Sequence, residues 1–79
     1  MTHDSLRRLR SGARELVLEL KQLSREADAA ALIETDPLRK CEIMKARDQF
    51  MYIASHFASA ANELGKAIAT LDATKLRKA

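Results

Sequence analysis

The sequence predicts an all-α fold, an antiparallel hairpin of two long helices that dimerises into a four-helix bundle. Two Gly and one Pro in 79 residues leave almost no turn residues for a β-sheet. Apolar residues recur in alternating steps of three and four, the spacing of packed helices. The chain (residues 1–79) makes one small domain whose core contributes only about 3–5 kcal/mol. Since its only cysteine is Cys41, no disulfide adds stability, and we expect self-association or a partner chain to do so instead.

The first helix is predicted over about residues 5–33. Its apolar residues follow a heptad pattern without a slip, which is typical of knobs-into-holes packing. We expect this stripe to face the second helix. Its members are Leu6, Leu9, Ala13, Leu16, Leu20, Leu23, Ala27 and Ala30.

The turn is predicted at residues 34–37, the only strong break in the helical pattern. Asp36 suits an N-cap, because its carboxylate can accept hydrogen bonds from the free N–H groups of the next turn. Pro37 then falls at the first helical position, where a missing N–H costs nothing. A connection this short makes the two helices antiparallel neighbours.

The second helix is predicted over about residues 38–75. Large side chains repeat every seven residues, and alanines beside them would let the helices approach closely. At about 1.5 Å per residue this helix outruns the first by about 10–15 Å, and we expect Leu71 and Leu76 to lie on that overhang. The repeating residues are Ile43, Phe50, Phe57, Leu64 and Leu71, flanked by Ala46, Ile53, Ala60 and Ala67 and by Ala54, Ala61 and Ile68.

Apolar residues off the main stripe of the second helix predict a protein-binding face. An isolated hairpin would leave these side chains exposed to solvent, and a surplus of exposed apolar residues marks an interaction surface. Met44, Met51 and Tyr52 are equally compatible with a dimer seam, and Cys41 is either an apolar filler or a thiol activated by nearby cations. The predicted protein-interaction residues are Leu38, Cys41, Met44, Met51, Tyr52, Leu71 and Leu76.

Positive charge gathers near both termini. Residues 1–14 carry a net +3 and residues 62–79 a net +2, whereas residues 15–61 carry −2. An antiparallel hairpin brings both segments to one tip, which could bind the phosphates of a nucleic acid or nucleotide. The other interpretation is that the C-terminal cations only favour the helix dipole and solubility. The candidate anion-binding residues are Arg7, Arg8, Arg10, Arg14, Lys75, Arg77 and Lys78.

We expect no catalytic residues, no metal, no cofactor and no enzymatic activity. Ser55 and Ser59 flank His56, but the chain has no turn that could form an oxyanion hole. One Cys and two distant His cannot close a zinc shell. We expect a cytoplasmic protein without a membrane partner, because no apolar stretch reaches about 18–20 residues and a lone thiol fits a reducing compartment.

The helix–turn–helix plan resembles that of the plasmid RNA-binding protein Rop, an antiparallel four-helix bundle as a dimer. It is also similar in shape to hairpin co-chaperones of type III secretion needle subunits and to small phage proteins that block a host component. No residue-level motif is shared, so no functional residue is transferred. The sequence therefore predicts a regulatory or chaperone-like module, forming a homodimer, that binds another protein of unknown identity, with Rop-like nucleic-acid or nucleotide binding at the basic tip as the alternative.

Overall fold

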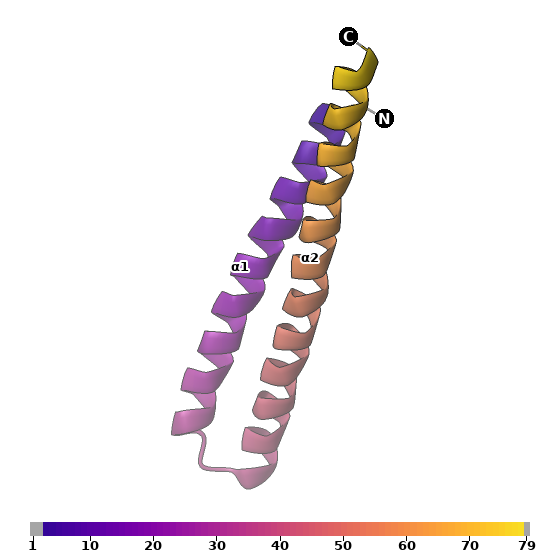
Figure 1. Cartoon of the computed structure of the whole chain (residues 1–79). Coiled ribbons are helices and arrows are strands. Elements are labelled where there is room, and N and C mark those ends of the chain that lie inside the picture. Colours follow the sequence, from indigo (N-terminus) through magenta and orange to yellow (C-terminus); the bar gives the residue numbers. More distant parts are fainter. Residues whose placement is uncertain (1–2, 79) are drawn as a thin grey trace.

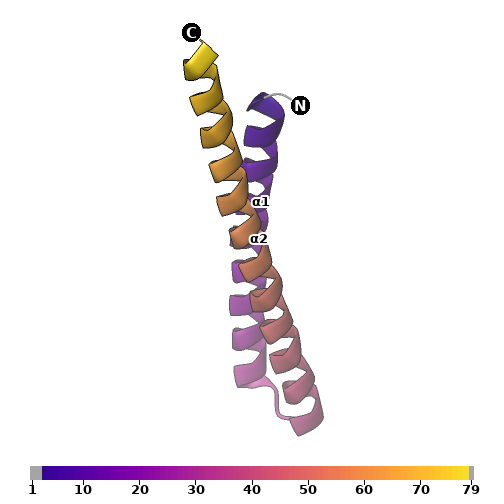
Figure 2. The same ribbon diagram turned by 45° about the vertical axis from the view of Figure 1, so that its right-hand side comes forward.

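The protein is a rod made of one helical hairpin. The computed structural model describes residues 3–78, with side chains described for residues 3–74. Helix α1 spans His3–Ile33 and helix α2 spans Pro37–Lys78. The two run antiparallel and side by side (Figure 1, Figure 2), and the rod measures 65 × 15 × 14 Å. The predicted all-α hairpin is confirmed.

The turn has the predicted capping geometry. The N–H of Leu38 donates to Asp36 Oδ1 at 3.1 Å, and the N–H of Lys40 donates to the Asp36 carbonyl at 2.9 Å. Asp36 is therefore the N-cap of α2, with Pro37 at the first helical position. Glu34 holds the turn from the other side, because its Oε1 accepts the N–H of Asp36 while its own N–H donates to the carbonyl of Ala30.

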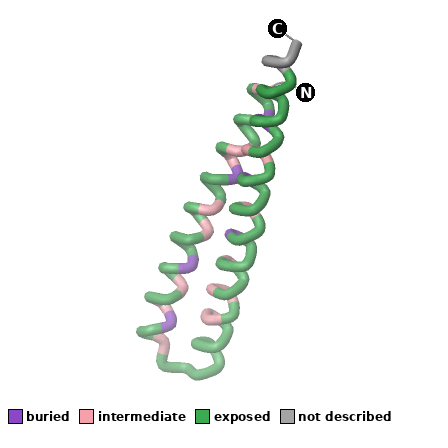
Figure 3. The backbone as a smooth tube through the Cα atoms, in the orientation of Figure 1, coloured by how far each residue is buried: buried purple, intermediate pink, exposed green. Residues whose placement is uncertain are grey.

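The contact between the helices is made mostly of small side chains. The buried residues of α1 are Leu6, Ala13, Ser24 and Ala31, and those of α2 are Ala54, Ala61 and Ile68. No large side chain among the described residues is fully buried. Figure 3 shows the few buried positions spaced along helices that are otherwise half-buried or exposed. Alanines at a helix contact let the backbones approach closely, but they bury little apolar area.

The predicted stripe of α1 is correct in one row and wrong in the other. Leu6, Ala13 and the half-buried Leu20 face α2 as expected. The second row of the contact is made by Val17, Ser24 and Ala31 with their heptad equivalents His3 and Arg10, whereas the leucines of the predicted row are exposed. The reason is geometric, since a single neighbouring helix covers only about two rows per helix. The exposed members of the predicted row are Leu9, Leu16 and Leu23, while its last member, Ala30, is half-buried.

Two side-chain contacts between the helices define the register. His3 Nε2 lies 2.7 Å from Asp72 Oδ1, and Arg47 Nη1 lies 2.9 Å from Asp28 Oδ1. In both pairs the residue numbers add to 75, so residues whose numbers add to about 75 lie level.

This register corrects the predicted overhang. Helix α2 has 42 residues against 31 in α1, and the excess is shared between both ends of the rod. Leu71 is not on the overhang, because α1 reaches the neighbouring Asp72. The side chain of Leu76 lies outside the described residues.

Removing the cap should weaken the hairpin. We expect Asp36→Ala to lower the free energy of unfolding by about 1 kcal/mol, because the N–H of Leu38 loses its acceptor. Asp36→Asn should keep most of the stability, since asparagine caps as well as aspartate. Urea unfolding at equal chain concentration measures both variants, and equal losses in the two would contradict the capping role.

Filling Gly65 should stabilise the protein. A Cβ at this position would lie 3.6 Å from Arg10 Cζ, an ordinary contact with the flexible end of a side chain. Because glycine inside a helix costs about 1 kcal/mol relative to alanine, we expect Gly65→Ala to raise the free energy of unfolding by up to about that amount. A lower urea midpoint would mean that the helices approach more closely here than the structure shows.

Candidate protein-interaction surface

One side of the hairpin is apolar along both helices. A groove on this side has polar residues only at its α1 edge. Residues seven apart lie two turns apart on the same side of a helix, so this side also includes Leu23 of α1 and Ile53 and Ala67 of α2. The groove is lined by Ser5, Arg8, Leu9, Gly12, Ala13 and Leu16 from α1 and by Phe57, Ala60 and Leu64 from α2. We call the exposed side chains of this side the apolar face: Leu9, Leu16, Leu23, Ile53, Ala60 and Ala67.

Large and small side chains form separate rows on the apolar face. Its large residues stay substantially exposed, at 57% for Leu9, 40% for Leu16 and 42% for Leu23 on α1, and at 41% for Ile53 on α2. By the register of the hairpin, each leucine lies level with a residue of α2 on the same face: Leu9 with Ala67, Leu16 with Ala60 and Leu23 with Ile53. A row of large side chains thus runs beside a row of mostly small ones.

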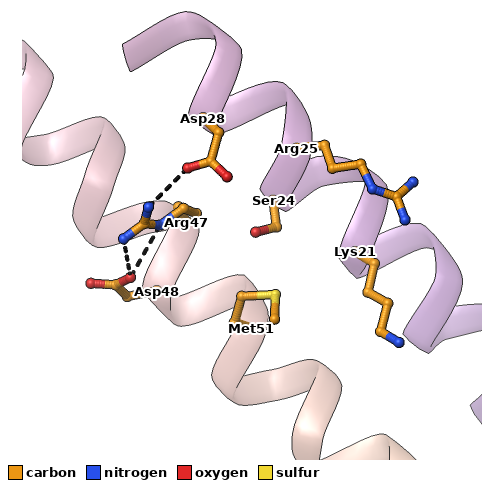
Figure 4. Close-up of a pocket in the computed structure, with 7 residues that line it drawn as sticks. All are labelled: Lys21, Ser24, Arg25, Asp28, Arg47, Asp48 and Met51. Atoms are coloured by element: carbon orange, nitrogen blue, oxygen red, sulfur yellow. Dashed lines mark hydrogen bonds and ion pairs between the residues drawn. The ribbon is translucent and has the colours of Figure 1, made fainter. Parts of the chain in front are cut away.

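The opposite side of the rod carries charged groups toward the turn, beside a mostly apolar hollow that Val17, Leu18, Ala58 and Ala61 line. Lys21, Arg25 and Asp28 of α1 meet Arg47 and Asp48 of α2 around a shallow pocket, with Ser24 and Met51 also in its wall (Figure 4). We call this the charged side. Lys21 and Leu23 are two residues apart, so they point about 200° apart around α1. The hairpin therefore separates an apolar face from a charged side.

Arg47 links the helices on the charged side. Its Nη1 donates to Asp28 Oδ1 at 2.9 Å, and its Nη2 and Nε donate to Asp48 Oδ1 at 2.9 and 3.2 Å (Figure 4). These hydrogen bonds, the one to Asp28 first, raise the pKa of Arg47 above its usual value against a smaller opposing effect of desolvation. The guanidinium therefore stays charged wherever the protein is folded, and the link helps to define the register.

The predicted protein-interaction residues do not form one apolar surface. Met51 lies among the charged groups of the pocket in Figure 4, and Met44 is half-buried. Tyr52 is exposed and stacks edge-on against His56, with 4.5 Å between ring centroids. Cys41 is an exposed free thiol.

The turn end of the rod carries exposed apolar residues as well. Leu38 is predicted as a binding residue, and Leu32 and Ile33, which precede the turn, are each 82% exposed. Leu71 lies at the other end, partly covered by the contact between the helices. The turn end is separate from the apolar face, which ends near Leu23 and Ile53.

The basic residues of α1 do not share one surface. Arg8 lines the groove of the apolar face. Arg10 is half-buried, with its guanidinium against Gly65, and Arg14 lies beside Val17 and Leu18. Arg7 is exposed. The side chains of Lys75, Arg77 and Lys78 lie outside the described residues.

Sequence reasoning missed the apolar face. It placed Leu9, Leu16 and Leu23 inside the hairpin and assigned protein binding to residues of α2 instead. The sequence does contain a signal for this face. When Val17 and Ala31 are counted with the heptad stripe, α1 has three apolar rows, and one neighbouring helix cannot cover all three.

Among residues 3–78 no group of His, Cys, Asp and Glu side chains could hold a metal ion. Neither described helix is long and apolar enough to cross a membrane. No protein-family model, no curated protein and no solved structure matches this chain.

The thiol of Cys41 reports on the outer surface of α2. Because it is exposed, we expect it to react with a disulfide reagent in the native protein about as fast as in urea. Stopped-flow or spectrophotometric thiol titration gives both rates. Strong protection in the native protein would mean that another chain covers this part of α2.

Proposed function

We propose that the chain is a non-enzymatic interaction module that binds a helical segment of a protein through its apolar face. The observation that carries the proposal is the groove between Leu9 and Leu16 of α1 and Ala60 of α2, which opens to solvent along one side of the rod. The charged groups of the charged side can remain hydrated while the apolar face is bound. Helices that lay apolar residues into such grooves are a recurrent mode of recognition.

The free energy available on this face is substantial. Fully burying a leucine or isoleucine side chain contributes about 1.5–3 kcal/mol, and Leu9, Leu16, Leu23 and Ile53 are each about half exposed. Covering them would contribute about 3–5 kcal/mol before ordering costs. Alanines in the groove would let a partner helix approach closely. The surface of the partner that is bound here would then be unavailable to other proteins. Such occupation would inhibit, restrain or chaperone the bound protein.

Site-specific crosslinking tests the proposal. A photoreactive phenylalanine replaces Leu9 in one protein and Leu18 in another, in cells that make the chain. Both positions are exposed, at 57% and 67%, and nine residues place them on opposite sides of α1. We expect crosslinks to a protein chain from position 9 and far fewer from position 18.

The matched position makes the outcome decisive. Crosslinks only from position 18 would contradict the apolar face as the binding surface. Crosslinks mainly to RNA or DNA would favour the alternative, phosphate binding by the terminal arginines and lysines, which also predicts binding that weakens steeply with salt.

A further inference from the structure

The hairpin has too much surface for its size. Its accessible surface is 6244 Å², whereas a compact folded chain of this mass exposes about 4,800 Å². Its radius of gyration is 18.3 Å, against about 12 Å for a compact chain of this length. The rod is one layer of two helices, and stable domains pack at least two layers around a core. About 1,400 Å² per chain is therefore exposed in excess.

This excess matches what a dimer buries. A standard protein interface removes about 800 Å² from each partner, and obligate dimers remove more. One peptide helix could span the roughly 21 Å from Leu9 to Leu23, but it would leave the flanking rows of the 65 Å rod uncovered. A second hairpin has the same length, so it can cover the apolar face from Leu9 to Leu23, about 21 Å, and the flanking rows beyond it.

The relief of the apolar face also suits a copy of itself. The leucine row of α1 is a ridge, and the alanines of α2 beside it form the floor of a groove at the same levels. A two-fold dimer uses one patch on both subunits, so the patch must contain both the projecting and the receiving surface. The half-buried Phe50, Phe57 and Leu64 lie at the base of this groove or continue its row, and a second hairpin would cover them.

We propose that the occupant of the apolar face is a second copy of this chain, which completes a four-helix bundle. This inference rests on the proposed function and names its partner. In the bundle the two apolar faces form the central core, while both charged sides stay in water. Cys41 and Leu18 lie away from the interface.

The test compares two matched leucines. Leu16→Glu places a charge in the centre of the interface, and Leu18→Glu places the same charge on the other side of α1. Sedimentation equilibrium should give twice the chain mass for the native protein and for Leu18→Glu. For Leu16→Glu the dissociation constant should rise about 100-fold or more, since each copy buries one carboxylate. A folded native monomer at all concentrations, or equal weakening by both substitutions, would overturn the proposal.

A second measurement covers the case in which Leu16→Glu does not fold. The thermal midpoint of the native protein and of Leu18→Glu should rise with chain concentration, as it does when folding and dimerisation are coupled. A concentration-independent midpoint in the native protein would overturn the dimer. If crosslinks from position 9 then still reach a different protein, the proposed function stands without the dimer. If position 9 also fails to crosslink, both fail.

Discussion

The buried positions between α1 and α2 are mostly alanine and serine, and this close, narrow contact determines which side chains stay exposed. Ala13, Ala31, Ala54 and Ala61 allow the two backbones to approach, but their side chains remove little apolar area from water. Only about two rows per helix can enter such a contact. Apart from Leu6 and Ile68, the larger side chains lie at its edges or outside it, where they stay partly exposed.

The two edges of the contact are chemically different, and this difference gives the rod two unlike sides. On one edge the third row of α1 is leucine, and the apolar face results. On the other edge Arg47 bridges Asp28 and Asp48 and helps to hold the register. Exposed ion pairs of this kind contribute little stability. Their value here is positional, since Arg47 joins the two helices at a fixed register on the side away from the proposed association surface.

The sequence predicts that an exposed apolar surface exists, but it does not predict which residues form it. Counting apolar residues correctly indicates a surplus, and the spacing of Leu9, Leu16 and Leu23 is visible in the heptad pattern. The pattern cannot say which two of three adjacent rows a neighbouring helix covers. Met51 looked like a binding residue because it lies off the main stripe, yet cross-helix contacts place it among Lys21, Asp28 and Arg47. Such contacts join residues that are far apart in the chain.

The sequence by itself determined the two helices, the turn and its cap, because these depend on local spacing, on Pro37 and on the hydrogen bond from Leu38 to Asp36. It also determined that apolar residues exceed what one hairpin can bury. Only the tertiary structure decided the rotation of α1 about its axis, the register and therefore the location of the apolar face. The physical reason is that helix rotation is selected by the summed packing of side chains across the contact, where Ser24 and Ala31 allow a closer approach than Leu16 and Leu23 would.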